Sequence, residues 1–221
     1  MHWVTRKLRG PELPAVGQNL DVRRGRLAHY LINFAVSSLW LFYAWRSFNL
    51  WHDTYATLQL MLLLRNTSLT ALFLCRRPAK VTSRSVKEWV IAMVGTCIGY
   101  FYGSGAVLLP GVATVLIIVA GCMCTVSILA LGRSFGIVPA NRGIIAGGPY
   151  AVVRHPIYLS YVVFDVGYLL GALSLHNVLV FVGLILSFYL RATYEERLLH
   201  QDPGYCEYAK RTPYMFIPGL L

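Results

Sequence analysis

Residues 89–131 read WVIAMVGTCIGYFYGSGAVLLPGVATVLIIVAGCMCTVSILAL, a stretch that contains no Asp, Glu, Lys or Arg. It divides at Pro110 into Trp89–Leu109 and Gly111–Leu131. Each half is close to the roughly 20 residues with which an apolar helix crosses the hydrocarbon core of a bilayer. Because proline interrupts the run and two glycines precede it, the stretch predicts two spanning helices joined as a tight hairpin.

Four more apolar runs have the composition of membrane helices. They are Ala28–Trp45, Thr54–Cys75, Pro156–Leu170 and Leu173–Leu190. The run from Pro156 is only about 15 residues, or roughly 23 Å of helix, and need not cross fully. The sequence therefore predicts an all-α, polytopic membrane helix bundle with about six transmembrane helices, of which five are long enough to be full spans.

The composition of the whole chain agrees with a membrane protein. Of its 221 residues, 57% are hydrophobic and only 13% are charged, and the mean hydropathy is +0.56. Soluble domains of this size carry about a quarter charged residues. The composition therefore excludes an ordinary soluble domain, and long apolar runs of this kind exclude a disordered chain.

The positive charge is distributed unevenly between the segments that connect these runs. The chain has 20 Lys and Arg against 9 Asp and Glu, a formal charge of +11. For a six-span arrangement, eighteen of the basic residues fall on one side of the membrane and only Arg46 on the other. Cytosolic loops of membrane proteins are enriched in Lys and Arg. We therefore expect cytosolic termini in a bacterial inner membrane or endoplasmic reticulum, and no nucleic-acid partner.

This distribution divides the chain into three parts. We expect a basic cytosolic segment at residues 1–27, four transmembrane helices within 28–131, and a region at 132–221 that carries the chemistry. Two charges, Arg65 and Asp165, lie inside apolar runs at similar depth. Since an isolated charge at this depth is costly, we expect them to form an ion pair, with direct contact to a cofactor or substrate as the alternative. The five cysteines have no zinc or disulfide spacing, so we expect no metal site.

A polar segment separates the fourth and fifth apolar runs. It contains the turn Gly147-Gly148-Pro149-Tyr150 and the sequence Arg154-His155-Pro156-Ile157-Tyr158. Proline suits the first position of a helix and biases the residue before it away from helical dihedral angles. This predicts that His155 stands at a helix N-terminus, where anions such as a carboxylate are attracted. A loop with a capping histidine is the simpler interpretation of the same residues.

A second polar cluster follows the last apolar run. Arg191 and Glu195 are four residues apart and share one face of the predicted helix. Glu196 is turned by about 100° from its neighbour, so at most one of the two glutamates faces a given pocket. Taken alone, the pair is equally typical of a solvated helix end.

Together, these segments resemble the C-terminal region of the isoprenylcysteine carboxyl methyltransferase family and of related integral-membrane methyltransferases. The resemblance covers residues 131–218 and rests on Gly148-Pro149-Tyr150, Arg154-His155-Pro156-x-Tyr158, Glu195-Glu196, and Gly204-x-x-x-Tyr208 followed by Pro213 and Pro218. One departure is Ser160, where the family commonly has glycine. The resemblance implies methyl transfer from S-adenosyl-L-methionine to a lipophilic acceptor, first of all a carboxylate of the isoprenylcysteine type.

The resemblance also implies roles for individual residues of this sequence. The cofactor-binding set carried over by position is Gly148, Tyr150, His155, Pro156, Tyr158, Glu195 and Glu196. We assign catalytic roles to Arg191, as the group that holds an acidic acceptor, and to Glu195, as the proton sink that an amine acceptor would need. The expected partners are a lipophilic small molecule or lipid and the membrane lipids, while the oligomeric state stays open.

Two other functions are compatible with parts of the sequence. Membrane sterol reductases, which use NADPH, have a C-terminal ending similar to Pro213-Tyr214-Met215-Phe216-Ile217-Pro218. Those reductases are usually longer and have more spans. A non-enzymatic membrane sensor or assembly factor that kept the fold is the third possibility. Binding of S-adenosylhomocysteine or of NADPH distinguishes the three.

Overall fold

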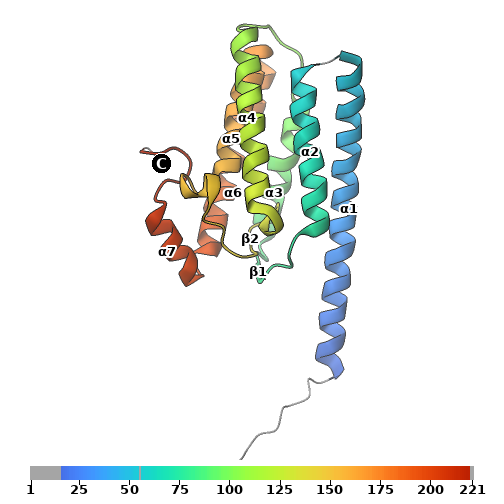
Figure 1. Cartoon of the computed structure of the whole chain (residues 1–221), viewed down its shortest axis with the longest axis vertical. Coiled ribbons are helices and arrows are strands. Elements are labelled where there is room, and N and C mark those ends of the chain that lie inside the picture. The colour runs from blue at the N-terminus through green and yellow to red at the C-terminus, as the bar shows by residue number, and fades with distance from the viewer. Residues whose placement is uncertain (1–15, 55, 220–221) are drawn as a thin grey trace, which may run out of the picture.

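The protein is a bundle of helices that run along one common axis (Figure 1). The structure is a computed structural model and describes residues 16–54 and 56–219. Its α-helices are α1 (Val16–Thr54), α2 (Thr57–Cys75), α3 (Val86–Cys97), α4 (Pro110–Leu131), α5 (Pro156–Gly171), α6 (Leu175–Leu199) and α7 (Pro203–Arg211). Two strands of two residues each, β1 (Val81–Thr82) and β2 (Ala140–Asn141), pair antiparallel. The mostly helical architecture confirms the predicted all-α class.

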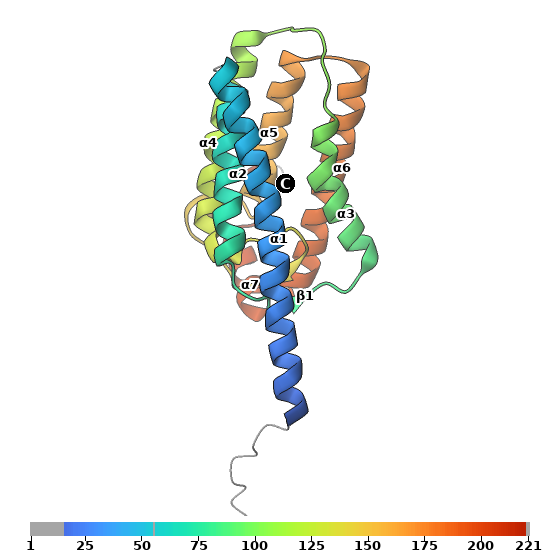
Figure 2. The ribbon, with the colours of Figure 1, turned by 90° about the vertical axis from the view of Figure 1, so that its right-hand side faces the viewer.

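The helices do not pack in simple chain order. α1 packs on α2, α2 on α4 and α4 on α5, whereas α3 packs on α6. Figure 2 shows α3 beside α6, on the other side of the bundle from α2 and α4. The bundle therefore encloses space between α2 and α5 on one side and α3 and α6 on the other.

Three of the described helices are long and apolar enough to cross a membrane. They are Thr57–Cys75, Pro110–Ser134 and Leu175–Leu199, while α5 is apolar but shorter. α1 presents an outward face of large apolar side chains that no other part of the described chain covers: Leu31, Phe34, Leu41, Phe42 and Trp45. An exposed apolar face of this size fits a lipid environment rather than water. The membrane location is thus supported, and the predicted number of about six spans stays a prediction.

The predicted boundaries of the first and second spans differ from the observed helices. α1 begins at Val16 and runs beyond Ala28–Trp45 in both directions, and α2 begins at Thr57 instead of Thr54. α6 continues past Leu190 to Leu199, in agreement with the helix predicted through Arg191 and Glu195. Of the predicted basic segment 1–27, residues 1–15 lie outside the described residues, and the remainder belongs to α1. Hydropathy locates the apolar centre of a helix, but polar turns extend these helices beyond it.

The predicted helical hairpin around Pro110 is wrong. α3 ends at Cys97, a short 3₁₀ turn covers Ile98–Phe101, and residues 102–109 are not helical. The backbone of Ala106 instead pairs with that of Leu173, with N···O distances of 2.8 and 2.7 Å. This connection crosses the end of the bundle from α3 to α4 (Figure 2). Its apolar composition resembles that of a membrane-spanning helix. Its backbone N–H and C=O groups, however, form hydrogen bonds with the turn between α5 and α6.

Asn177 holds this connection in place. It is fully buried, its Nδ2 donates to Gly103 O (2.9 Å) and Ala172 O (2.6 Å), and its Oδ1 accepts from Gly103 N (2.9 Å). Asn177→Ala removes these partners of Gly103 N and Ala172 O and leaves Gly103 O with only the hydrogen bond from Tyr168 OH (3.3 Å) among the described residues. We expect a loss of about 2 kcal/mol in the free energy of unfolding. Limited proteolysis in detergent should then cut within residues 102–109. Thr114→Ala, an exposed position on α4, is the control and should leave both properties unchanged.

The segments rich in basic residues lie at one end of the bundle. The α2–α3 connection, the α4–α5 connection and α7 are all found there (Figure 1). The β1–β2 pairing joins the first two of these connections, with Val81 opposite Asn141. We call this end the basic end, and it is where the predicted site residues gather.

Candidate functional site

The turn before α5 requires a glycine. Gly148 has φ +62°, a left-handed conformation, and begins a 3₁₀ turn through Ala151 that places Tyr150 in the interior. Gly147 precedes it with φ −105° and no atom near the position of a Cβ. Because a side chain is unfavourable only at the left-handed position, Gly148→Ala should destabilise the protein by about 1 kcal/mol. Gly147→Ala is the matched control and should be neutral; equal effects in thermal unfolding would refute this explanation.

His155 stands directly before α5, as predicted. Pro156 occupies the first position of the helix, and His155 has φ −125° and ψ 59°, outside helical values. The backbone N–H groups of Arg154 and His155 donate to the carbonyls of Tyr214 and Met215, both at 2.9 Å. The C-terminal segment thus accepts hydrogen bonds from two backbone N–H groups at the entry to α5. From the sequence, we expected N–H groups at this position to bind a ligand.

Glu196 connects three separate parts of the chain. Its Oε1 accepts from Arg154 Nε (2.8 Å) and Tyr205 OH (2.7 Å), and His155 Nε2 lies 2.8 Å from the same oxygen. Arg154 Nη1 also donates to the carbonyls of Thr212 (3.0 Å) and Pro213 (2.6 Å). The Glu196 side chain is only 10% exposed. Glu196 therefore joins α6 to the start of α5 and to α7.

Glu195 points in a different direction from Glu196. Tyr158 OH donates to its Oε1 at 3.2 Å, and His155 Nδ1 lies 3.6 Å from its Oε2. The rings of His155 and Tyr158 stack with centroids 5.6 Å apart. Glu195 lines a cavity and Glu196 does not. The imidazole of His155 therefore sits between two carboxylates that have different surroundings.

α7 closes the basic end through its tyrosines. Tyr208 OH donates to the carbonyl of Tyr150 at 2.7 Å, and Tyr150, Tyr205 and Tyr208 form one buried cluster. Burial raises the pKa of Tyr208 to about 12, and burial together with the Glu196 carboxylate raises the pKa of Tyr205. Both phenols therefore stay protonated and act as hydrogen-bond donors at neutral pH.

Asp202 begins α7. Its side chain accepts from Gly204 N (3.0 Å) and from Asn141 Nδ2 (2.8 Å). The hydrogen bond from Asn141 and that from Gly204 lower the pKa of Asp202. This N-cap therefore fixes α7 to β2 while the carboxylate is ionised.

A cavity of about 370 Å³ extends from this end into the bundle. Of the predicted site residues, Tyr150, His155, Tyr158, Arg191 and Glu195 line it. Gly148, Pro156 and Glu196 do not, although all three lie in the segments that shape its wall. Among the residues that the structure describes, no cluster of three or more His, Cys, Asp or Glu could hold a metal ion.

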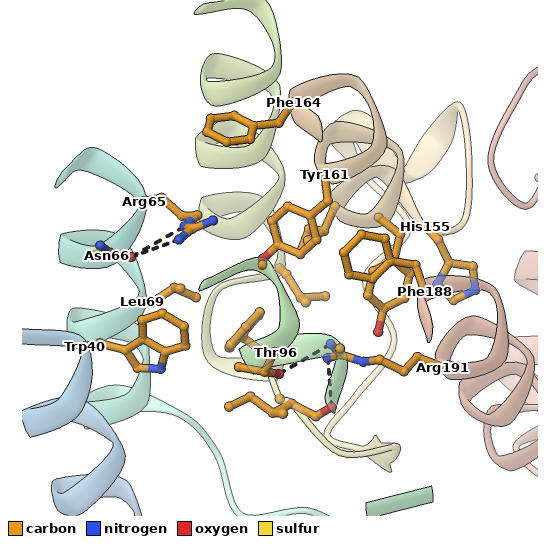
Figure 3. A pocket seen from close by; sticks show the side chains of 18 of the residues that line it. Trp40, Arg65, Asn66, Leu69, Thr96, His155, Tyr161, Phe164, Phe188 and Arg191 are labelled. Carbon is orange, nitrogen blue, oxygen red and sulfur yellow. Dashed lines mark hydrogen bonds between the residues drawn. The ribbon is translucent and has the colours of Figure 1, made fainter. Parts of the chain in front are cut away.

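Arg191 enters the cavity from α6 (Figure 3). Its Nη2 donates to Ile137 O at 3.0 Å and its Nη1 to Thr96 Oγ1 at 3.5 Å, while Nε is buried and has no partner in the described chain. The guanidinium lies 5.3 Å from the centre of the Tyr158 ring, a cation–π distance. The orientation of the Arg191 guanidinium is thus fixed, and its Nε–H group has no acceptor among the described residues.

Sequence reasoning missed the role of Arg142. This residue follows β2 and lines the cavity, and its Nε and Nη1 are buried without a partner in the described part of the chain. Burial lowers the pKa of the Arg142 guanidinium. It is the only charged residue between Arg133 and Arg154, a signal that the sequence did contain. Its two unused donors are available to an anionic group in the cavity.

The predicted Arg65–Asp165 ion pair is not formed. Arg65 donates to Asn66 Oδ1 from Nε and Nη2, both at 3.4 Å, and no salt bridge of the described residues joins it to Asp165. Both side chains instead line the cavity. Similar depth in two helices did not imply contact, because the space of the cavity separates the two faces.

Comparison with known sequences indicates which protein family has a similar sequence in this region. Residues 112–201 match the sequence model of the isoprenylcysteine carboxyl methyltransferase (ICMT) family. The match runs from α4 to the end of α6 and includes His155, Tyr158 and Glu195, whereas α7 and the C-terminal segment lie outside it. No curated protein sequence matches the chain. Residues 112–201, less than half of the chain, are therefore similar to the isoprenylcysteine carboxyl methyltransferase family.

Proposed function

We propose that the protein transfers a methyl group from S-adenosyl-L-methionine to a lipophilic acid at the basic end of the cavity. One observation carries this proposal: His155 and Tyr158 from α5 and Glu195 from α6 meet on one cavity wall, inside the range that matches a methyltransferase family. That match favours methyl transfer over the reductase alternative.

The residues present suit the cofactor chemically. When bound, S-adenosyl-L-methionine supplies an electrophilic methyl group on a positively charged sulfur. Glu195 can accept charge-assisted hydrogen bonds from an ammonium group or a ribose hydroxyl. The Tyr150 hydroxyl is buried, lines the cavity and has no partner in the described residues, so it offers a further donor.

The acceptor side of the cavity suits an acid. Arg142 and Arg191 line it and carry buried guanidinium N–H groups without a partner in the described chain, and we assign these donors to the acceptor carboxylate. A carboxylate of the isoprenylcysteine type needs no general base to act as nucleophile. Holding it in a site that excludes bulk water replaces its hydration shell by these two fixed donors. An amine acceptor would instead use Glu195 as the proton sink.

The orientation in the membrane is part of the same proposal. The basic connections and α7 lie together at the basic end of the bundle (Figure 1), and segments rich in Lys and Arg are typical of the cytosolic side of membrane proteins. The cofactor would thus enter from the cytosol, while the apolar body of the acceptor occupies the cavity between the helices.

Isothermal titration in detergent tests this function. We expect S-adenosylhomocysteine to bind and His155→Ala to abolish binding, because His155 lies between the two glutamates at the cavity wall. The matched control is His52→Ala, an exposed histidine at the other end of α1, which should bind normally. Binding of NADPH but not of S-adenosylhomocysteine would identify a reductase, and binding of neither would indicate a non-enzymatic role.

A further inference from the structure

Two side chains of opposite charge line the cavity near the centres of their helices without pairing with each other. Arg65 on α2 and Asp165 on α5 each lie about 15 Å from the basic end of their helix. Asp165 is 7% exposed, and the hydroxyl of Tyr102 faces its carboxylate. This hydroxyl is itself buried, and by distance and angle it makes no regular hydrogen bond with a described residue.

The guanidinium of Arg65 also makes few hydrogen bonds with the described residues. Its hydrogen bonds are the two long ones to the neighbouring Asn66, and Figure 3 shows its side chain on the far side of the cavity from Arg191. An ionisable group at this depth of a membrane bundle is costly and usually serves a function. A charged or polar group that is buried without a partner is costly for the same reason. This arrangement therefore needs a ligand that satisfies both charges.

We propose that Arg65, Asp165 and Tyr102 form a second polar subsite, the distal subsite, which binds a neutral hydroxyl or amide group at the far end of the methyl acceptor. The proposal rests on the proposed function, because methyl transfer is assigned to the other end of the same cavity. A neutral group of this kind accepts from Arg65 and donates to Asp165 at the same time. A cation would be attracted by Asp165 but repelled by Arg65, and an anion the reverse, so neither gains from both side chains.

The spacing of the two ends defines the shape of this acceptor. His155 and Asp165 are ten residues apart along α5, which corresponds to about 15 Å. Between them the wall is apolar and aromatic, with Tyr161, Phe164 and Phe188 (Figure 3). The acceptor class is therefore a two-ended amphiphile: an acid at the basic end, an apolar body, and an uncharged polar group at the other end.

Fatty acids that differ only at their far end test the distal subsite. In lipid nanodiscs, 12-hydroxydodecanoate should bind the native protein about tenfold more tightly than dodecanoate, since hydrogen bonds to charged groups are strong. This preference is opposite to that of a purely apolar cavity, which would favour the more hydrophobic dodecanoate. 12-Aminododecanoate and dodecanedioate should both bind more weakly than the hydroxy acid. Tighter binding of either charged compound would overturn the assignment to a neutral group.

Variants test whether the preference for the hydroxy acid depends on Arg65 and Asp165. Arg65→Leu combined with Asp165→Leu should remove the preference, so that dodecanoate binds as tightly as the hydroxy acid. Thr114→Val, an exposed position on α4, is the control and should retain the preference. Equal binding of the two acids to the native protein, or a preference that survives in the double variant, would refute the subsite. The fatty-acid comparison needs no cofactor, so its failure is distinct from a failure to bind S-adenosylhomocysteine.

Discussion

Replacing Glu196 with alanine is expected to lower the free energy of unfolding by about 3 kcal/mol, the range found when one partner of a buried ion pair is removed. The variant leaves Arg154, His155 and Tyr205 without the carboxylate oxygen that they share. Since these residues belong to the entry of α5 and to α7, both should detach from α6. The loss of structure at the basic end should also abolish binding of S-adenosylhomocysteine.

Equilibrium unfolding in detergent, with titration of S-adenosylhomocysteine, measures both effects. The control is Glu207→Ala, which removes the same side chain from the exposed face of α7. It should change neither stability nor binding, because an exposed charge of this kind contributes little. A Glu196→Ala protein as stable as the Glu207→Ala protein would show that the connection made by Glu196 is not structural.

Replacing Glu195 with glutamine should produce the opposite pattern. Glu195 lines the cavity, and its contacts within the chain are the 3.2 Å hydrogen bond from Tyr158 and the 3.6 Å approach of His155. A glutamine keeps the shape and can still accept from Tyr158, so the free energy of unfolding should change by less than about 1 kcal/mol. Loss of the negative charge should weaken S-adenosylhomocysteine binding roughly 10- to 100-fold, the value of a charge-assisted hydrogen bond.

The comparison of the two neighbouring variants is the decisive measurement. Titration should show weak binding to a folded Glu195→Gln protein, and Glu195→Asp should restore part of the affinity because it restores the charge. If Glu195→Gln unfolds as readily as Glu196→Ala while the folded fraction still binds normally, the assignment of the two glutamates must be exchanged.

Much of the architecture could be predicted from the sequence. Apolar runs of spanning length predicted the helices α2, α4 and α6, because a backbone in lipid must satisfy its hydrogen bonds within a helix. Pro156 predicted the start of α5 and the position of His155. The same reasoning failed for residues 102–109, because apolar composition cannot distinguish a helix from a connection whose backbone bonds to another turn.

The site could be predicted only in part. The order of the polar motifs identified the segments that meet, and the 100° rotation between neighbouring helical residues predicted that Glu195 and Glu196 diverge. The sequence could not indicate which glutamate faces the cavity, since that depends on how α7 packs against α6 and brings Tyr205 to Glu196. Arg191 was selected because it shares a face of the predicted helix with Glu195, whereas Arg142 could not be selected until the structure showed that its guanidinium lines the cavity without a partner in the described residues.

The sequence by itself determined the class of the protein, a helical membrane protein, and the segments that carry its polar chemistry, because hydropathy and helix-ending residues act locally. Only the tertiary structure decided that α3 packs on α6 and that Arg65 and Asp165 face a cavity instead of each other. It also decided that Glu196 bonds to Arg154 and Tyr205 while Glu195 lines the cavity. These outcomes depend on which surfaces meet between segments far apart in the chain, and no local pattern of residues specifies that.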